Sequence, residues 1–221
     1  GPFRAEGPEN ENRISQLLEK TVRLTDSVRD RVSGQFMWLL YSHDNPGRVQ
    51  SGEGYRAMDQ VGPVNYKGLF TIWGEPVDAF YMYRANFVRA RTHPMVYIVS
   101  HRWADRWTQP GVKGSISVYS NCDEVELFND VDHQSLGRRH RSGIGTHFQW
   151  NHVDIRYNVL YAVGYVDGKA VATDCIVLHH LPPAPSLARL RDTVNLTRPV
   201  AGERYLYRVN CGGPDYRDAN G

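Results

Sequence analysis

Residues 114–129 read GSISVYSNCDEVELFN, and their pattern decides the fold class of the middle of the chain. Successive side chains of a β-strand point to opposite faces of the sheet. Ile116 and Val118 would therefore share one face of a first strand, and Val125 and Leu127 one face of a second. The alternation breaks at positions 121–123. The stretch predicts two strands joined by a tight bend.

The bend contains Cys122 and Asp123 with Glu124 beside them, residue types that can form a metal or catalytic site. A metal site of this kind would need a His or a second Cys at ligand spacing, and the stretch has neither. In a bend, Asn and Asp bond local backbone groups, and Cys fits as a small buried residue. The cluster is therefore interpreted as scaffold.

The same alternation continues on both sides of this stretch. Short β-branched and aromatic runs separated by turn residues are typical of an all-β sandwich. Val166-Asp167-Gly168-Lys169 carries the Asp-Gly signal of a two-residue hairpin. The runs are MVYIVSHRW (95–103), THFQWNHV (146–153), YNVLYAVGYVDG (157–168) and KAVATDCIVL (169–178).

Upstream of about residue 92 the apolar spacing is helical instead. Residues 13 to about 32 place apolar side chains at steps of three and four, which predicts a helix ending at Ser33-Gly34. The apolar run GQFMWLLYS (34–42) predicts a strand buried on both faces, and a second helix is expected from about Pro76. Residues 43–66 form a long polar loop, a type that is often functional. Together they indicate the last turns of an α/β unit.

Composition excludes several function classes. A net charge of +2 over 221 residues gives no argument for nucleic-acid binding, and no apolar run approaches the roughly 20 residues that span a bilayer. The three cysteines lack CxxC or Cys/His spacing, so no zinc site is expected, and they form one disulfide or remain isolated thiols. No metal-ligand residues are assigned and no cofactor is expected, while the sequence leaves calcium binding open. The first residues lack signal-peptide features and begin without Met, which indicates a piece of something longer.

Five sequence runs resemble the immunoglobulin-like domain that follows the catalytic barrel in many bacterial family 2 glycoside hydrolases of the β-galactosidase type. They are YIVSHRW, VYSNCDEVELFND with the later SLG, FQW, YNVLYAVGYVDGK and TDCIVL. GQFMW (34–38) looks like the eighth barrel strand, and KGLFTIWGEPVDAFYMYRANF (67–87) looks like the segment that closes the barrel. RYLYRVNCGGPDYRD near the end resembles the first strand of a malectin-like domain.

The resemblance implies a multidomain chain. Residues 1–92 would form the C-terminal end of a (β/α)₈ TIM barrel, and residues 93–182 an immunoglobulin-like β-sandwich. Residues 183–203 would be a Pro-rich linker, and residues 204–221 the first strand of an incomplete malectin-like carbohydrate-binding domain. Exposed strand edges at residues 34–41 would make the chain prone to associate, while the sequence leaves its oligomeric state open.

The activity that the resemblance implies is retaining hydrolysis of O-glycosidic bonds in oligo- or polysaccharides by two glutamates. Both catalytic glutamates are expected upstream of Gly1, so this chain holds no catalytic residue and is expected to be inactive alone. Glu53, Glu75, Asp44 and Asp59 are accordingly given no catalytic role. The parent enzyme is expected to be periplasmic or secreted.

Three residues are candidate substrate-binding residues under this resemblance. Trp38 would stack on the sugar in the cleaved subsite, unless it is a core residue under the barrel rim. His43 and Asp44 would bond sugar hydroxyls, unless Asp-Asn-Pro-Gly (44–47) is simply a turn. The chain departs from the family pattern at Ser42, where an Asp is common, and at Val77, where a Lys is usual. The sugar therefore stays undefined.

An alternative of a different class is a non-catalytic carbohydrate-binding or scaffold module built on the sandwich. Binding would need an exposed aromatic platform, for which Trp103, Trp107 and Trp150 are the candidates. Trp103 and Trp107 lie four residues apart in HRWADRWTQPG, a predicted loop. A third possibility is that the sandwich only braces the barrel and binds no ligand.

Overall fold

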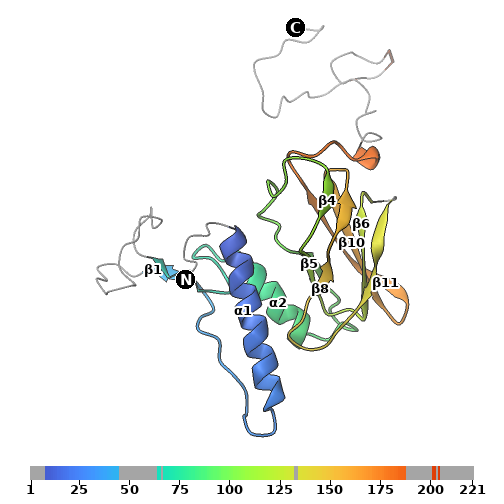
Figure 1. Ribbon diagram of the computed structural model, residues 1–221. Coiled ribbons are helices and arrows are strands. Elements are labelled where there is room, and N and C mark those ends of the chain that lie inside the picture. The colour runs from blue at the N-terminus through green and yellow to red at the C-terminus, as the bar shows by residue number, and fades with distance from the viewer. Residues whose placement is uncertain are drawn as a thin grey trace.

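The computed structural model describes residues 8–44, 64–65, 67–131, 134–187, 201–202 and 204. Most of the predicted linker at 183–203 and the predicted strand in 204–221 lie outside the described residues, as do Glu53, Asp59 and Cys211. In the described part strands predominate, and residues 96–177 form an all-β unit (Figure 1). The expected barrel end and domain boundaries stay predictions.

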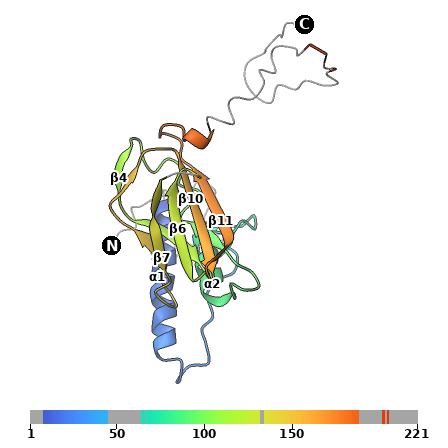
Figure 2. The same ribbon diagram turned by 90° about the vertical axis from the view of Figure 1, so that its right-hand side faces the viewer.

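The all-β unit consists of antiparallel strands in three groups. One sheet has the order β11-β10-β6-β7, formed by Lys169–Val177, Val159–Val166, Glu124–Asn129 and Ser135–His140. A second has the order β3-β5-β8, formed by Val96–Ile98, Ile116–Ser120 and Phe148–Trp150. A two-stranded sheet pairs β4 (Gly111–Lys113) with β9 (Val153–Ile155). Figure 2 shows the four strands of the first sheet side by side, with α1 behind them.

The core between the sheets confirms the alternation predicted from residues 114–129. Val125 and Leu127 of β6 are fully buried, while Glu124, Glu126 and Phe128 are only half-buried on the other face. Ile116 and Val118 of β5 join the same core. The Asp-Gly hairpin is also confirmed, since Val166 pairs with Lys169 and both turn residues have positive φ, as a type I′ turn requires.

Two helices cover the second face of the three-stranded sheet, which makes a third layer (Figure 1). The helices are α1 (Pro8–Ser27) and α2 (Asp78–Phe87). Val22 of α1 and Met82 of α2 pack against Tyr97 and Tyr119 of β3 and β5. This explains why every residue of β5 is buried, because one face meets the opposite sheet and the other meets the helices. No described helix is long and apolar enough to cross a membrane.

The predicted bounds of the first helix were wrong by about five residues at each end. The helix begins at Pro8, where proline is tolerated because its missing N–H would be unpaired in the first turn. It ends at Ser27, and residues 28–31 continue as turns with bonds such as Arg31 N–H to the Val28 carbonyl. Val28 and Val32 extend the apolar spacing but are exposed, so no packing holds this last part helical. The second helix begins two residues after Pro76, close to the prediction.

The predicted buried strand at 34–42 was also wrong. Phe36, Trp38 and Leu40 are exposed, and the first strand among the described residues is the short β1 (His43–Asp44), paired with β2 (Val64–Asn65). A strand buried on both faces needs neighbouring strands and a layer over each face. In the described chain, residues 39–42 are paired with residues 68–70, through bonds such as Ser42 N–H to the Phe70 carbonyl.

Candidate functional site

The three predicted sugar-binding residues lie on one segment that leads into β1. Trp38 is 74% exposed, so the described chain does not bury it as a core residue. Asp44 is exposed and His43 half-buried, and the His43 Nδ1–H donates to the backbone carbonyl of Asp44 at 2.9 Å. That bond leaves Nε2 of a neutral imidazole as an acceptor for a hydroxyl. Their sugar-binding role stays a prediction, and most of the 44–47 turn lies outside the described residues.

Close backbone pairing fixes the position of this segment. Ser42 is buried, and its Oγ accepts a hydrogen bond from the Gly68 N–H at 3.2 Å. A Cβ on Gly68 would lie 2.2 Å from the Ser42 nitrogen, so only glycine permits this approach. The rings of Tyr41 and Phe70 stack with centroids 5.1 Å apart. Both β2 and residues 68–70 therefore pair with the segment that carries Trp38 and His43.

A second exposed tryptophan, Trp73, follows three residues after Phe70 and had no assigned role in the sequence analysis. It is 75% exposed and sits in a turn built on Thr71, whose Oγ1 accepts from the Trp73 and Glu75 N–H groups at 3.3 and 3.1 Å. Gly74 supplies the positive φ of the turn. The sequence signal was Gly74 followed by Pro76, which marks a turn but does not reveal that Trp73 is exposed.

The aromatic platform proposed for the sandwich is only partly available. Trp150 is fully buried in β8, and its Nε1–H donates to the Gly137 carbonyl at 2.9 Å, so this candidate was wrong. Trp103 and Trp107 are half-buried, and the guanidinium carbon of Arg106 lies 5.5 and 5.7 Å from their ring centroids. Both rings therefore pack against a half-buried cation.

Arg106 holds the loop that contains both tryptophans. Its guanidinium donates to the carbonyls of Val99 at 2.7 Å, Ser100, and Trp103 at 2.8 Å. Burial lowers its pKa to about 10, against the opposing effect of the nearby Asp78 carboxylate. At neutral pH the side chain is a cation that ties three carbonyls together, which is a structural role.

The Cys122–Glu124 cluster is scaffold, as the sequence analysis interpreted it. Cys122 is buried, the Asp123 carboxylate accepts from the Asp167 N–H at 3.1 Å, and Glu124 pairs with Arg138 at 3.5 Å. The two carboxylates thus have separate partners, and the thiol is covered. Across the described residues, no group of three or more His, Cys, Asp or Glu side chains is arranged to hold a metal ion.

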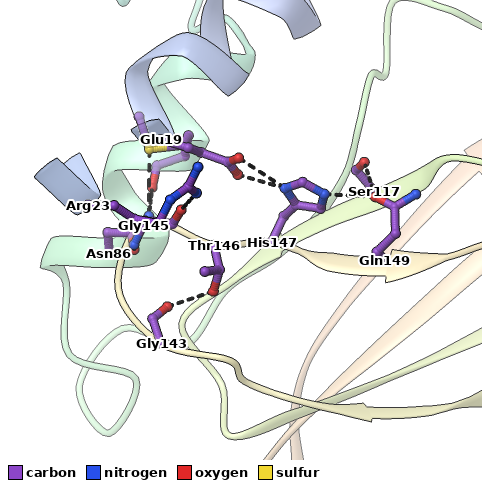
Figure 3. Close-up of polar contacts among 10 residues, drawn as sticks. Glu19, Arg23, Asn86, Ser117, Gly143, Gly145, Thr146, His147 and Gln149 are labelled. Carbon is purple, nitrogen blue, oxygen red and sulfur yellow. Dashed lines mark hydrogen bonds and ion pairs between the residues drawn. The ribbon is translucent and has the colours of Figure 1, made fainter. Parts of the chain in front are cut away.

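A buried polar network between α1 and the sandwich was missed from the sequence. His147, just before β8, contacts the Glu19 carboxylate of α1 through Nδ1 at 2.8 and 3.1 Å (Figure 3). Its Nε2 contacts Gln149 Oε1 at 2.7 Å, and that oxygen also accepts from the Ser117 hydroxyl. In the sequence, Glu19 lies four residues after Ser15, so the two share one face of the helix. This spacing does not reveal that His147 is the partner of Glu19.

Comparison with known proteins relates the chain to bacterial glycosidases. Residues 111–172 match a family model described as a domain of unknown function (DUF4982). A curated protein of Formosa agariphila, named "Putative beta-glucuronidase", is 30% identical over 179 residues, which are 79% of this chain and 20% of that protein.

Solved structures give the same relationship. A beta-glucuronidase of Parabacteroides merdae is 26% identical with a TM-score of 0.60, over 77% of this chain and 20% of that one. A beta-glycosidase of Bacteroides vulgatus is 28% identical with a TM-score of 0.53, over 72% of this chain and 18% of that one. The chain thus spans about a fifth of the length of these relatives.

Proposed function

We propose that the chain is the C-terminal part of a retaining β-glycosidase of glycoside hydrolase family 2. The similarity to a protein named as a glycosidase over 79% of the chain carries this proposal, because a match of that length extends well beyond the sandwich. The substrate would be an oligo- or polysaccharide, and the parent enzyme would work in the periplasm or outside the cell. In a retaining enzyme two carboxyl groups about 5 Å apart act as acid/base and nucleophile. We place both outside this chain, which would then be inactive alone.

The segment around β1 and β2 is the part of the chain that would meet the sugar. Trp38 offers an open ring face, and such faces stack on the apolar side of a pyranose. His43 and Asp44 offer a nitrogen and a carboxylate for hydroxyl groups. Stacking and hydroxyl contacts hold the ring in the orientation that the carboxyl groups need, which is the positioning part of catalysis.

The sugar that we propose is a β-glucuronide rather than a β-galactoside. Two relatives carry beta-glucuronidase names, and a glucuronide differs from a galactoside in having a carboxylate at C6. A carboxylate is recognised by a cation. Lys67 is exposed and lies two residues after β2, next to Gly68, which contacts Ser42. This places a Lys beside the segment of Trp38 and His43, and we propose that it binds the carboxylate.

The sandwich would act as a brace for this segment. The Tyr97 hydroxyl of β3 donates to the buried Asp78 carboxylate of α2 at 2.6 Å. Arg102, in the loop after β3, pairs with Glu75 at 3.1 Å, in the turn that presents Trp73. A non-catalytic sugar-binding module is less favoured, because Trp150 is buried and Arg106 packs against both of the other rings.

The test uses the product of the whole reading frame that encodes this chain, assayed with 4-nitrophenyl β-D-glucuronide and the matching β-D-galactoside. We expect hydrolysis of the glucuronide. Lys67→Gln should raise its KM about 10- to 100-fold, the effect of losing one hydrogen bond to a charged group, and leave any galactoside hydrolysis unchanged. Lys169→Gln, in the exposed hairpin, is the matched control.

Each outcome decides a separate part of the proposal. If no β-glycoside is hydrolysed, the glycosidase function is wrong. If Lys67→Gln impairs both substrates equally, the glycosidase function stands and the proposed carboxylate contact is wrong.

A further inference from the structure

The contact between Glu19 and His147 joins residues 128 positions apart and is shielded from water. The Glu19 side chain is 4% exposed and the His147 side chain 22%. Glu19 belongs to α1 and His147 to the segment that enters β8, so the pair fastens the helix layer to the sandwich (Figure 3). A buried charge is stable only when it is paired and hydrogen-bonded, so the protonation state of this pair matters.

The hydrogen bonds around Gln149 determine which of its amide atoms faces His147. The Ser115 backbone N–H donates to Asn151 Oδ1 at 3.0 Å, so this atom is an oxygen acceptor. Gln149 contacts the same oxygen at 3.0 Å and must present its NH₂ group there. Its carbonyl oxygen therefore points to His147 Nε2 at 2.7 Å and to the Ser117 hydroxyl at 3.0 Å.

This orientation requires one hydrogen on Nε2 of His147 and another between Nδ1 and the Glu19 carboxylate. Nε2 faces an amide oxygen, which only accepts, so Nε2 must donate. Nδ1 faces both oxygens of Glu19, so a hydrogen must lie between Nδ1 and the carboxylate. Loss of this proton would set a nitrogen lone pair against carboxylate oxygens at 2.8 Å. The geometry therefore favours an imidazolium paired with a carboxylate.

No other group described around His147 supplies the hydrogen between its Nδ1 and the Glu19 carboxylate. Arg23 of α1 donates to the Gly145 carbonyl and opposes a positive charge on the ring, and Asn86 of α2 is occupied by the Gly145 N–H at 2.6 Å. Tyr119 of β5 meets the ring edge-on, and burial and the Glu19 carboxylate raise the pKa of its hydroxyl, which therefore stays neutral. Burial lowers the pKa of His147, but the bond and charge of Glu19 and the bond to Gln149 outweigh it, so the pKa is raised above 6.5.

We propose that protonated His147 is a pH-sensitive latch that holds α1 on the sandwich and loosens as the medium becomes alkaline. A group whose folded-state pKa is raised contributes stability that is complete below its unfolded value, here about 6.5. The contribution falls as pH rises toward the folded-state pKa, and it is absent above that. In this window the equilibrium for detaching α1 should shift by up to about tenfold per pH unit, because one proton is released. The latch does not depend on the proposed catalytic role.

The test combines NMR and hydrogen exchange on the chain of 221 residues. The ring Cε1–Hε1 signal of His147 should titrate with a midpoint above 6.5. Protection factors of α1 amides, corrected for intrinsic exchange, should fall between pH 6.5 and that midpoint and stay level above it. Glu19→Gln keeps the size of the side chain but removes its charge, so the midpoint should drop and the pH dependence of α1 protection should vanish. Glu124→Gln is the matched control, because Glu124 pairs with the exposed His140 at 3.2 Å.

The proposal is overturned if wild-type His147 titrates at or below 6.5, or if α1 protection does not change with pH. It is also overturned if Glu19→Gln leaves the His147 midpoint in place. The wild-type titration decides the question even if the variant fails to fold. Glu124→Gln should leave the His147 midpoint and the pH dependence of α1 protection unchanged.

Discussion

Asn121 joins the end of β5 to the chain that connects α2 with β3, and its replacement by Asp tests this junction. Its Oδ1 accepts from the Met95 N–H at 2.9 Å, and its Nδ2 donates to the carbonyls of Val88 at 3.0 Å and His93 at 2.9 Å. The residue is buried. Asn121→Asp keeps the shape and the accepting oxygen but replaces the donor with an oxygen that faces two carbonyls.

The cost follows from the groups that lose their partner. A buried polar group left without a hydrogen bond costs about 1–3 kcal/mol, so two carbonyls give about 2–6 kcal/mol. For a chain of this size each kcal/mol lowers Tm by about 2–4 °C, so a loss on the order of 10 °C is expected at pH 7. The introduced carboxylate is buried among acceptors, so its pKa should rise above the usual value of about 3.9. Its penalty is present above the folded-state pKa and is relieved as pH falls through it, since a protonated carboxyl can donate.

The assay is thermal unfolding followed by circular dichroism at pH 7 and pH 5. The Tm difference from the wild type should be smaller at pH 5. Asp123→Asn is the control, because this exposed neighbour accepts one bond that an amide oxygen can also accept, and its Tm should stay within about 2 °C. An Asn121→Asp protein as stable as the wild type at pH 7 would refute the three-bond arrangement.

Two further predictions concern the sandwich core. Gly164→Ala should lower the free energy of unfolding by about 1–3 kcal/mol, because the new Cβ would lie 2.6 Å from Val96 Cγ2 and 2.7 Å from Cys122 Sγ. Gly114→Ala is the control, because a Cβ there would have nothing within 4 Å. Equal Tm values for the two variants would contradict this packing. Burial raises the pKa of both Cys122 and Cys175, but only Cys175 is exposed, so iodoacetamide at pH 8 should modify Cys175 first and reach Cys122 only on unfolding. Peptide mass spectrometry measures both rates, and equal rates in the folded protein would show that Cys122 is accessible.

The sequence alone determined those features that depend on neighbours within a few residues. Val125 and Leu127 alternate with Glu124 and Glu126, and this period identified both the strand and its buried face. Asp167 and Gly168 identified a hairpin, because few residues tolerate the positive φ of its turn. A helix near Pro76 followed from the same kind of local signal.

Only the tertiary structure decided which side chains are covered and by what. The run at 34–42 and Trp150 are both apolar, yet Phe36 is exposed and Trp150 is buried, because β8 has a sheet and a core beside it. Glu19 and His147 lie 128 residues apart in the sequence, and no local sequence pattern predicts that their side chains are in contact. Burial and pairing depend on contacts between distant segments, and those contacts form only when the helices pack on the sandwich.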